Sequence, residues 1–141
     1  MFTRKASARY EGFGKEGKGH LSTESGVLHD VPYSFSTRFG DERGTNPEEL
    51  IAAAHAGCFT MALSFALAKE GFSAGSLATE ARVTVEQGPE GFTVTRSDLL
   101  VEGKVEGISA EQFAEIAESA KANCPISRLL KAEISLDQKL Q

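Results

Sequence analysis

Cysteine is scarce in this sequence: the 141 residues contain only Cys58 and Cys124, and no CxxC pair. Positive charge is not in excess either, because 15 lysines and arginines stand against 20 aspartates and glutamates, without a basic stripe. A nucleic-acid-binding protein needs such a stripe to neutralise phosphates. We therefore expect no nucleic-acid partner.

The sequence also lacks the usual signals of secretion and of catalysis on phosphates or esters. Charge follows the N-terminus at Arg4 and Lys5 with no apolar segment behind it, so we expect no signal peptide. We expect no uncharged stretch long enough to span a bilayer, no membrane association and a cytoplasmic location. No glycine-rich phosphate loop and no nucleophile-elbow serine occurs. In a reducing cytoplasm, two cysteines seldom form a permanent structural disulfide.

What the sequence does contain is one domain's worth of globular composition, with 40% apolar and 25% charged residues. With no internal repeat or linker, we expect a single domain over residues 1–141. Alternating apolar and polar residues predict several short strands separated by turns. The segments expected as strands are residues 4–10, 19–24, 33–39, 81–86, 92–101 and 134–140. A capped helix is expected after Ser109, which gives an α+β pattern with antiparallel sheets.

The strongest predicted element is a long helix between Asn46 and Gly71. Asn46 suits the N-cap, and Glu48 and Glu49 suit the positive end of the helix dipole. Residues 50–68 are apolar almost all the way round the helix, which predicts burial on nearly every side. Because so small a chain has little material to cover such a helix, we expect an intertwined homodimer.

The two cysteines are the first candidates for chemistry, although buried cysteines often only fill space. Cys58 lies in the middle of the long helix, directly after Gly57, where glycine costs about 1 kcal/mol relative to alanine. Such a glycine indicates the close approach of another backbone or of a ligand. Cys124 precedes Pro125 and so is expected at the N-cap of a short helix, where the dipole favours a thiolate. On these local features Cys124 is the more easily activated thiol.

Cys58 in mid-helix needs a nearby cation to become reactive, and Arg38 is the best candidate. Arg38 stands on the face of its predicted strand opposite the aromatic side chains, where a solvated arginine is the ordinary alternative. Glu48 and Glu49 are expected to stabilise the start of the helix, unless one of them also holds Arg38. His55 precedes Cys58 by three residues and lies on a neighbouring surface of the same helix.

Other functions are compatible with the same residues. Cys58, Cys124 and His55 are residue types that bind zinc, although no CxxC or HxxxH spacing supports a metal site. A non-catalytic, ligand-binding dimeric stress protein with both cysteines packed in its core is a further alternative. A cysteine–histidine hydrolase is less favoured, because no carboxylate is placed to orient His55 and no oxyanion site is evident.

Three separated segments resemble the OsmC/Ohr family of thiol-dependent hydroperoxide reductases. Residues 33–39 resemble the arginine-bearing strand of that family, and residues 44–59 resemble its long helix with the peroxidatic cysteine. Residues 123–127 resemble its second-cysteine motif. Residues 22–28 and His55 resemble the OsmC branch more than the Ohr branch. The resemblance extends over essentially the whole chain.

This resemblance implies an OsmC-like α+β fold, with antiparallel sheets around a buried central helix in an interlocked homodimer with two interfacial active sites. Cys58 would be the peroxidatic thiolate and Cys124 the resolving cysteine. Arg38 would stabilise the thiolate and the peroxide, and Glu48 would position Arg38. These implied roles replace the local preference for Cys124 as the nucleophile.

The implied activity is reduction of organic hydroperoxides, and more weakly of hydrogen peroxide, in oxidative or osmotic stress defence. An external dithiol or a lipoylated protein would regenerate the thiols, and no metal, haem or flavin cofactor is required. An apolar lining that includes Phe59, Met61 and Ile126 would favour alkyl hydroperoxides.

One geometric prediction is independent of the family. Glu48 and Cys58 lie ten residues apart, which is about 15 Å along an ideal helix axis. One guanidinium cannot easily touch both residues of the same helix. We therefore predict that the Glu48 working with a given Cys58 belongs to the other subunit, or meets Arg38 only at its far end.

Overall fold

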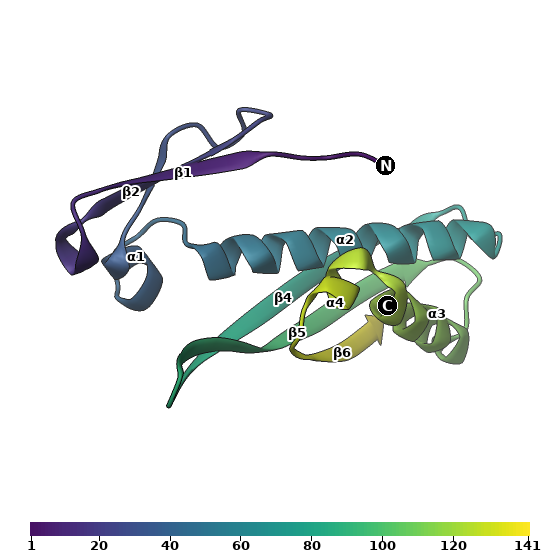
Figure 1. Ribbon diagram of the computed structural model, residues 1–141. Coiled ribbons are helices and arrows are strands. Elements are labelled where there is room, and N and C mark those ends of the chain that lie inside the picture. Colours follow the sequence, from purple (N-terminus) through teal and green to yellow (C-terminus); the bar gives the residue numbers. More distant parts are fainter. The chain divides into compact units, whose positions relative to one another are not determined.

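The structure, a computed structural model, describes every residue from Met1 to Gln141 and divides the chain into two units, residues 1–50 and 51–141. Each unit has its own three-stranded sheet, and each is described by itself (Figure 1). The long helix α2 (Pro47–Lys69) begins in the first unit and continues through the second.

The first unit is an antiparallel sheet followed by a short helix. The sheet has the order β1-β2-β3, which confirms the first two predicted strands. Its elements are β1 (Ala6–Glu11), the 3-10 turn η1 (Gly14–Glu16), β2 (Lys18–Thr23) and β3 (Val31–Tyr33). None of the buried apolar side chains of the protein lies in this unit. Sheet hydrogen bonds and exposed ion pairs, such as Arg9 with Asp30, therefore hold the unit with little help from hydrophobic burial.

The strand predicted over residues 33–39 is wrong, because the structure has helix α1 (Phe35–Phe39) there. Ser34 caps this helix: its hydroxyl accepts from the Thr37 N–H at 3.2 Å, and the Thr37 hydroxyl accepts from the Ser34 N–H at 2.8 Å. This reciprocal cap satisfies two backbone donors that a strand would leave for a neighbour. Phe35 and Phe39 also fit a helical spacing of four, and their ring centroids lie 5.1 Å apart. Arg38 therefore sits on a helix, not on a strand.

The long helix is confirmed as Pro47–Lys69, and its predicted cap is present because the Asn46 side chain accepts from the Glu49 N–H at 2.8 Å. Burial on nearly every side was predicted for a homodimer, and the single chain shows the part of it that one subunit supplies. A single stripe is buried, and it consists of His55, Phe59, Leu63 and Leu67. Met61 is 62% exposed and Phe65 is 71% exposed. Within the second unit α2 is thus covered on one face, and Met61 and Phe65 are exposed.

The expectation that no segment could span a bilayer is also corrected, since α2 is long and apolar enough to do so by length and composition. The central helix of a soluble protein meets the same criteria. Phe59, Leu63 and Leu67 pack into the core of the second unit, as in a soluble core helix.

The second unit packs α2 against a sheet of order β4-β5-β6, with α3 completing the core (Figure 1). Besides α2, this unit consists of β4 (Gly75–Gly88), β5 (Gly91–Val105), α3 (Ala110–Asn123), α4 (Pro125–Leu129) and β6 (Glu133–Leu140). The predicted hairpin is confirmed as β4 and β5. The predicted helix after Ser109 is also confirmed, and the Ser109 hydroxyl accepts from the Gln112 N–H at 3.1 Å.

The antiparallel prediction fails for the last strand, because β6 pairs with β5 in parallel. The chain leaves β5, passes through α3 and α4, and returns to the edge of the same sheet. A helical crossover of this kind allows parallel pairing, whereas a short turn does not. This crossover carries Cys124, at the junction between α3 and α4, back toward α2.

Candidate functional site

The two cysteines, distant in sequence, meet in the second unit. Cys58 on α2 and Cys124 at the start of α4 are free thiols that hydrogen-bond to each other. Cys124 has no exposed surface, whereas Cys58 is half-buried. A peroxide can therefore approach Cys58 more readily than Cys124, and the first thiol to be oxidised can find the second already in contact.

The start of α4 is directed at Cys58. Cys124 occupies the N-cap with Pro125 at the first helical position, as predicted, but its side chain makes no capping hydrogen bond. The Ile126 backbone N–H donates to the sulfur of Cys58 instead. The local argument that this helix start activates Cys124 is therefore not supported, because the amide that could stabilise a thiolate there serves Cys58.

The pKa of Cys58 reflects opposing influences. Burial raises the pKa of the thiol, and the hydrogen bond with Cys124 raises it further. The Ile126 N–H lowers the pKa, because it stabilises the charged sulfur, but the net shift is upward. No cation is among these influences. Within its own unit, then, Cys58 lacks the partner that would keep it ionised at neutral pH.

A strongly held cation lies in the first unit. Arg38 donates from Nη2 to Glu48 Oε1 at 2.6 Å and from Nε to both carboxylate oxygens at 3.0 and 3.1 Å. The Glu48 side chain is only 13% exposed and that of Arg38 is 38% exposed. These hydrogen bonds raise the pKa of the Arg38 guanidinium, so it stays charged. Its Nη1 takes no part in these bonds and is the donor left for another group.

The structure thus brings the four predicted site residues together as two pairs. Cys58 and Cys124 form one pair in the second unit, and Arg38 and Glu48 form the other in the first unit. Glu48 lies in the first turn of α2 and also binds Arg38. The sequence analysis had left open that one of the two glutamates at the helix start holds this arginine.

The sequence analysis named His55 but missed its two hydrogen-bond partners, Ser97 and Ser127. His55 is fully buried, with Nδ1 2.6 Å from the Ser97 hydroxyl and Nε2 2.8 Å from the Ser127 hydroxyl. Burial lowers the pKa of His55. A signal for Ser97 was present in the sequence, because it precedes Leu99 and Val101 on the buried face of β5. A polar residue on such a face needs a buried partner.

The metal-site alternative finds no support in this geometry. No cluster of three or more histidine, cysteine, aspartate or glutamate side chains is arranged to hold a metal ion. Both ring nitrogens of His55 are already bound to serines.

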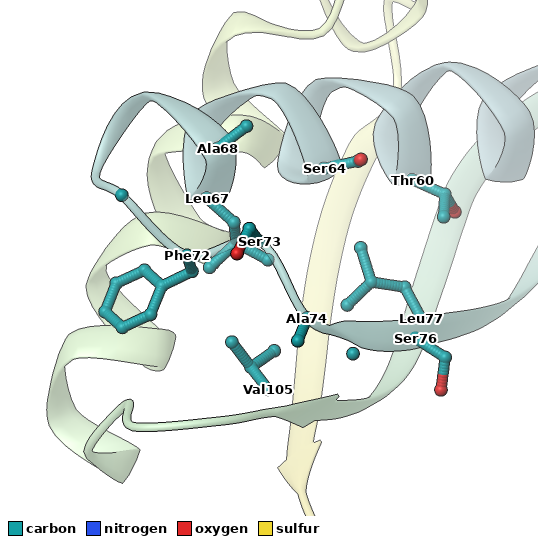
Figure 2. A pocket seen from close by; sticks show the side chains of 12 residues that line it. Thr60, Ser64, Leu67, Ala68, Phe72, Ser73, Ala74, Ser76, Leu77 and Val105 are labelled. Carbon is teal, nitrogen blue, oxygen red and sulfur yellow. The ribbon is translucent and has the colours of Figure 1, made fainter.

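A cavity of about 600 Å³ opens elsewhere in the second unit, between the last turns of α2 and the start of β4 (Figure 2). Figure 2 shows Thr60 and Ser64 on α2 at one side of it and Leu77 of β4 at the other. Its lining includes neither cysteine, so this cavity is not the centre of thiol chemistry.

Comparison with known proteins identifies the family. The model of the OsmC-like protein family matches residues 40–139. The chain belongs to the OsmC-like family. Peroxiredoxin OsmC of Escherichia coli (strain K12) is 52% identical over 138 residues, covering 98% of this chain and 96% of that protein. The organic hydroperoxide resistance protein OhrB of Bacillus subtilis (strain 168) is 27% identical, covering 100% of this chain and 98% of that protein.

Solved structures agree on the fold. The crystal structure of Bacillus subtilis OhrB matches with a TM-score of 0.70 and 25% identity, covering 99% of this chain and 98% of that one. An organic hydroperoxide resistance protein OsmC from Legionella pneumophila matches with a TM-score of 0.74, 22% identity and coverage of 100% and 98%. The predicted OsmC-like α+β fold is thereby confirmed.

Proposed function

We propose that this OsmC-like protein is a thiol-dependent peroxidase that reduces organic hydroperoxides, and hydrogen peroxide more weakly, in stress defence. The observation that carries the proposal is the contact between Cys58 and Cys124 next to α4. Cysteines that merely fill a core have no reason to meet from distant segments with one sulfur half-buried and bonded to a backbone amide. The similarity to Peroxiredoxin OsmC supports the same chemistry.

The reaction has two steps. The Cys58 thiolate attacks the distal oxygen of the hydroperoxide, the O–O bond breaks, and the alkoxide takes a proton and leaves as the alcohol. Cys58 is then a sulfenic acid. The Cys124 thiol attacks its sulfur, so that a disulfide and one water molecule form. An external dithiol or a lipoylated protein reduces the disulfide, and the protein itself needs no metal or organic cofactor for either step.

Arg38 supplies the charge that Cys58 lacks in its own unit. A guanidinium lowers the pKa of a nearby thiol and stabilises the oxygen that leaves the peroxide. Because Glu48 binds Nε and Nη2, the free Nη1 is the donor available to the sulfur and the peroxide. The helical distance from Glu48 to Cys58 favours delivery of this arginine to the Cys58 of a partner subunit.

The proposed activity is tested by comparing peroxides. With dithiothreitol as reductant, the protein is expected to consume cumene hydroperoxide at least about tenfold faster than hydrogen peroxide, because Cys58 and Ile126 both pack against the apolar core. Consumption followed at equal peroxide concentrations gives the ratio of kcat/KM. Equal rates would contradict the substrate class, and no consumption of either peroxide by the reduced protein would contradict the function.

We further propose that residues 1–141 act as one domain that is completed only in a homodimer. The first unit contributes no buried apolar side chain, and α2 leaves Met61 and Phe65 exposed. A second copy supplies matching apolar surface for both, as expected for an obligate dimer interface. A cytoplasmic location, with no membrane or nucleic-acid partner, stays part of the proposal.

Phe65→Glu is expected to convert the dimer to monomers at micromolar protein concentration. The change places a charge where the proposed interface is apolar, and burying an unpaired charge costs several kcal/mol. Sedimentation velocity measures the assembly state directly. Lys69→Glu on the last turn of the same helix is the control for charge alone and should leave the dimer intact. A Phe65→Glu protein that remains dimeric would show that this face is not the interface.

A further inference from the structure

His55 is a titratable side chain that neither step of the proposed reaction uses. It is fully buried, and both of its ring nitrogens bond to serine hydroxyls. Burial disfavours the charged form and lowers the pKa of the ring, so His55 is neutral at neutral pH. A neutral imidazole has one N–H and one lone pair, so it donates to one serine and accepts from the other.

The two hydrogen bonds join three elements. Ser97 lies in the central strand β5, His55 in α2 and Ser127 in α4. The chain Ser97–His55–Ser127 therefore ties the short helix α4 through α2 to the middle of the sheet. Ser97, like His55, is fully buried, so this end of the chain is fixed by the core.

The helix α4 is also restrained at its start, because its N-cap Cys124 is fully buried and Arg128 donates to the Asn123 side chain at 3.2 Å. It is five residues long and contains no buried residue, and the Cys124 side chain makes no capping bond. Ile126 packs against the core, and the Ile126 N–H donates to the Cys58 sulfur. That second contact involves the reacting atom itself. The bond from His55 to Ser127 involves no sulfur and can persist while Cys58 is oxidised.

His55 and Ser127 each lie close in sequence to one of the two cysteines. His55 lies one helical turn before Cys58, and Ser127 follows Cys124 by three residues. A disulfide forms only within a narrow range of Cα separations and dihedral angles. A small displacement of α4 would therefore leave the two sulfurs in the wrong geometry for attack.

We propose that the hydrogen bond between His55 and Ser127 is the positioning device for the resolving step, holding α4 so that Cys124 can close onto oxidised Cys58. The inference rests on the proposed roles of the two cysteines. In the step concerned, the Cys124 thiol attacks the Cys58 sulfenic acid, the S–O bond breaks, and a disulfide and water form. His55 is a positioning residue and exchanges no proton with the substrate.

The first test separates the two steps in single-turnover experiments on the full-length reduced protein. Ser127→Ala removes the link to α4, and Ser97→Ala is the matched control that keeps it. Sulfenic acid formation with cumene hydroperoxide is followed by dimedone trapping, and disulfide formation by mass spectrometry after alkylation. For Ser127→Ala we expect sulfenic acid formation within about twofold of wild type and disulfide closure slowed roughly tenfold, since misplacement by 1 Å costs up to 10²-fold.

A second pair of variants separates the effects of the hydrogen bonds made by the two ring nitrogens of His55. The side-chain amide of glutamine reaches the position of Nε2, and that of asparagine reaches the position of Nδ1. His55→Gln should therefore keep the bond to Ser127 and close the disulfide near the wild-type rate. His55→Asn should form the disulfide as slowly as Ser127→Ala does. The two His55 variants should therefore differ, although both lose the imidazole. A purely structural role would slow both in proportion to their loss of melting temperature.

An equilibrium measurement keeps this proposal separate from the peroxidase proposal, because it uses no peroxide. In mixtures of oxidised and reduced dithiothreitol, the equilibrium constant for the Cys58–Cys124 disulfide should fall roughly tenfold in Ser127→Ala and little in Ser97→Ala. Unchanged closure rates and unchanged equilibria in Ser127→Ala and His55→Asn would overturn the positioning role. A shifted equilibrium in a protein that consumes no peroxide would support the positioning role and overturn the proposed function.

Discussion

Replacing Cys58 with serine is expected to lower the turnover of cumene hydroperoxide by roughly 10³-fold or more, the usual scale for loss of a nucleophile. The serine hydroxyl fills nearly the same space, so the fold should be unaffected. At neutral pH, however, a hydroxyl supplies almost no anion to attack the O–O bond, and it cannot form a sulfenic acid. Peroxide consumption in the presence of dithiothreitol, with matched melting temperatures, measures the effect.

Cys124→Ser is the matched variant for this prediction. It keeps the nucleophile, so one equivalent of peroxide should still be consumed, and the sulfenic acid on Cys58 should persist long enough for dimedone to label it. With excess peroxide it should pass to the sulfinic acid. A Cys58→Ser protein that retains turnover lost in Cys124→Ser would reverse the two roles, as the local argument from the sequence first favoured.

The second large effect concerns Arg38. Arg38→Ala is expected to lower kcat/KM roughly 10²-fold or more, on the scale of one lost transition-state donor. Burial and Cys124 already raise the pKa of Cys58, so without the cation less thiolate is present at a given pH. The rise of activity with pH should therefore move to higher pH in Arg38→Ala. The pH profile of kcat/KM measures both effects.

Mixed dimers decide which subunit supplies the arginine. We would co-express Arg38→Ala and Cys58→Ser chains with different affinity tags and purify the heterodimer through both tags. If Arg38 serves the Cys58 of its partner, one site of the heterodimer is intact, and about half of the wild-type activity should return from two inactive parents. An inactive heterodimer would show that each arginine serves the cysteine of its own chain.

The long helix was predictable because its signals are local. Asn46 caps it, and the charges of Glu48 and Glu49 fit its dipole. The apolar face that remains exposed on α2 was also visible in the sequence as a helix apolar all round. The error at residues 33–39 arose from a real ambiguity, because Phe35 and Phe39 satisfy both the strand and the helix periods. There the reciprocal cap between Ser34 and Thr37 decided in favour of the helix.

The contacts between the site residues could not be predicted from the sequence around each of them. Nothing in the spacing of Cys58 and Cys124 shows that they meet, because their contact depends on the crossover that returns the chain to β6 in parallel. The resemblance to a family supplied that pairing in advance. The resemblance did not name Ser97 or Ser127. Only the packing of β5, α2 and α4 shows that they bind the two nitrogens of His55.

The sequence by itself determined the family and most of the elements, since capping, periodicity and motif order are properties of neighbouring residues. The reactive residues were proposed from the family resemblance. Only the tertiary structure decided which thiol receives the Ile126 amide and which serine hydroxyls bind the two nitrogens of His55. Hydrogen bonds of this kind depend on orientations of groups from separate elements within a few tenths of an ångström. That precision is set by packing, and a sequence pattern does not contain it.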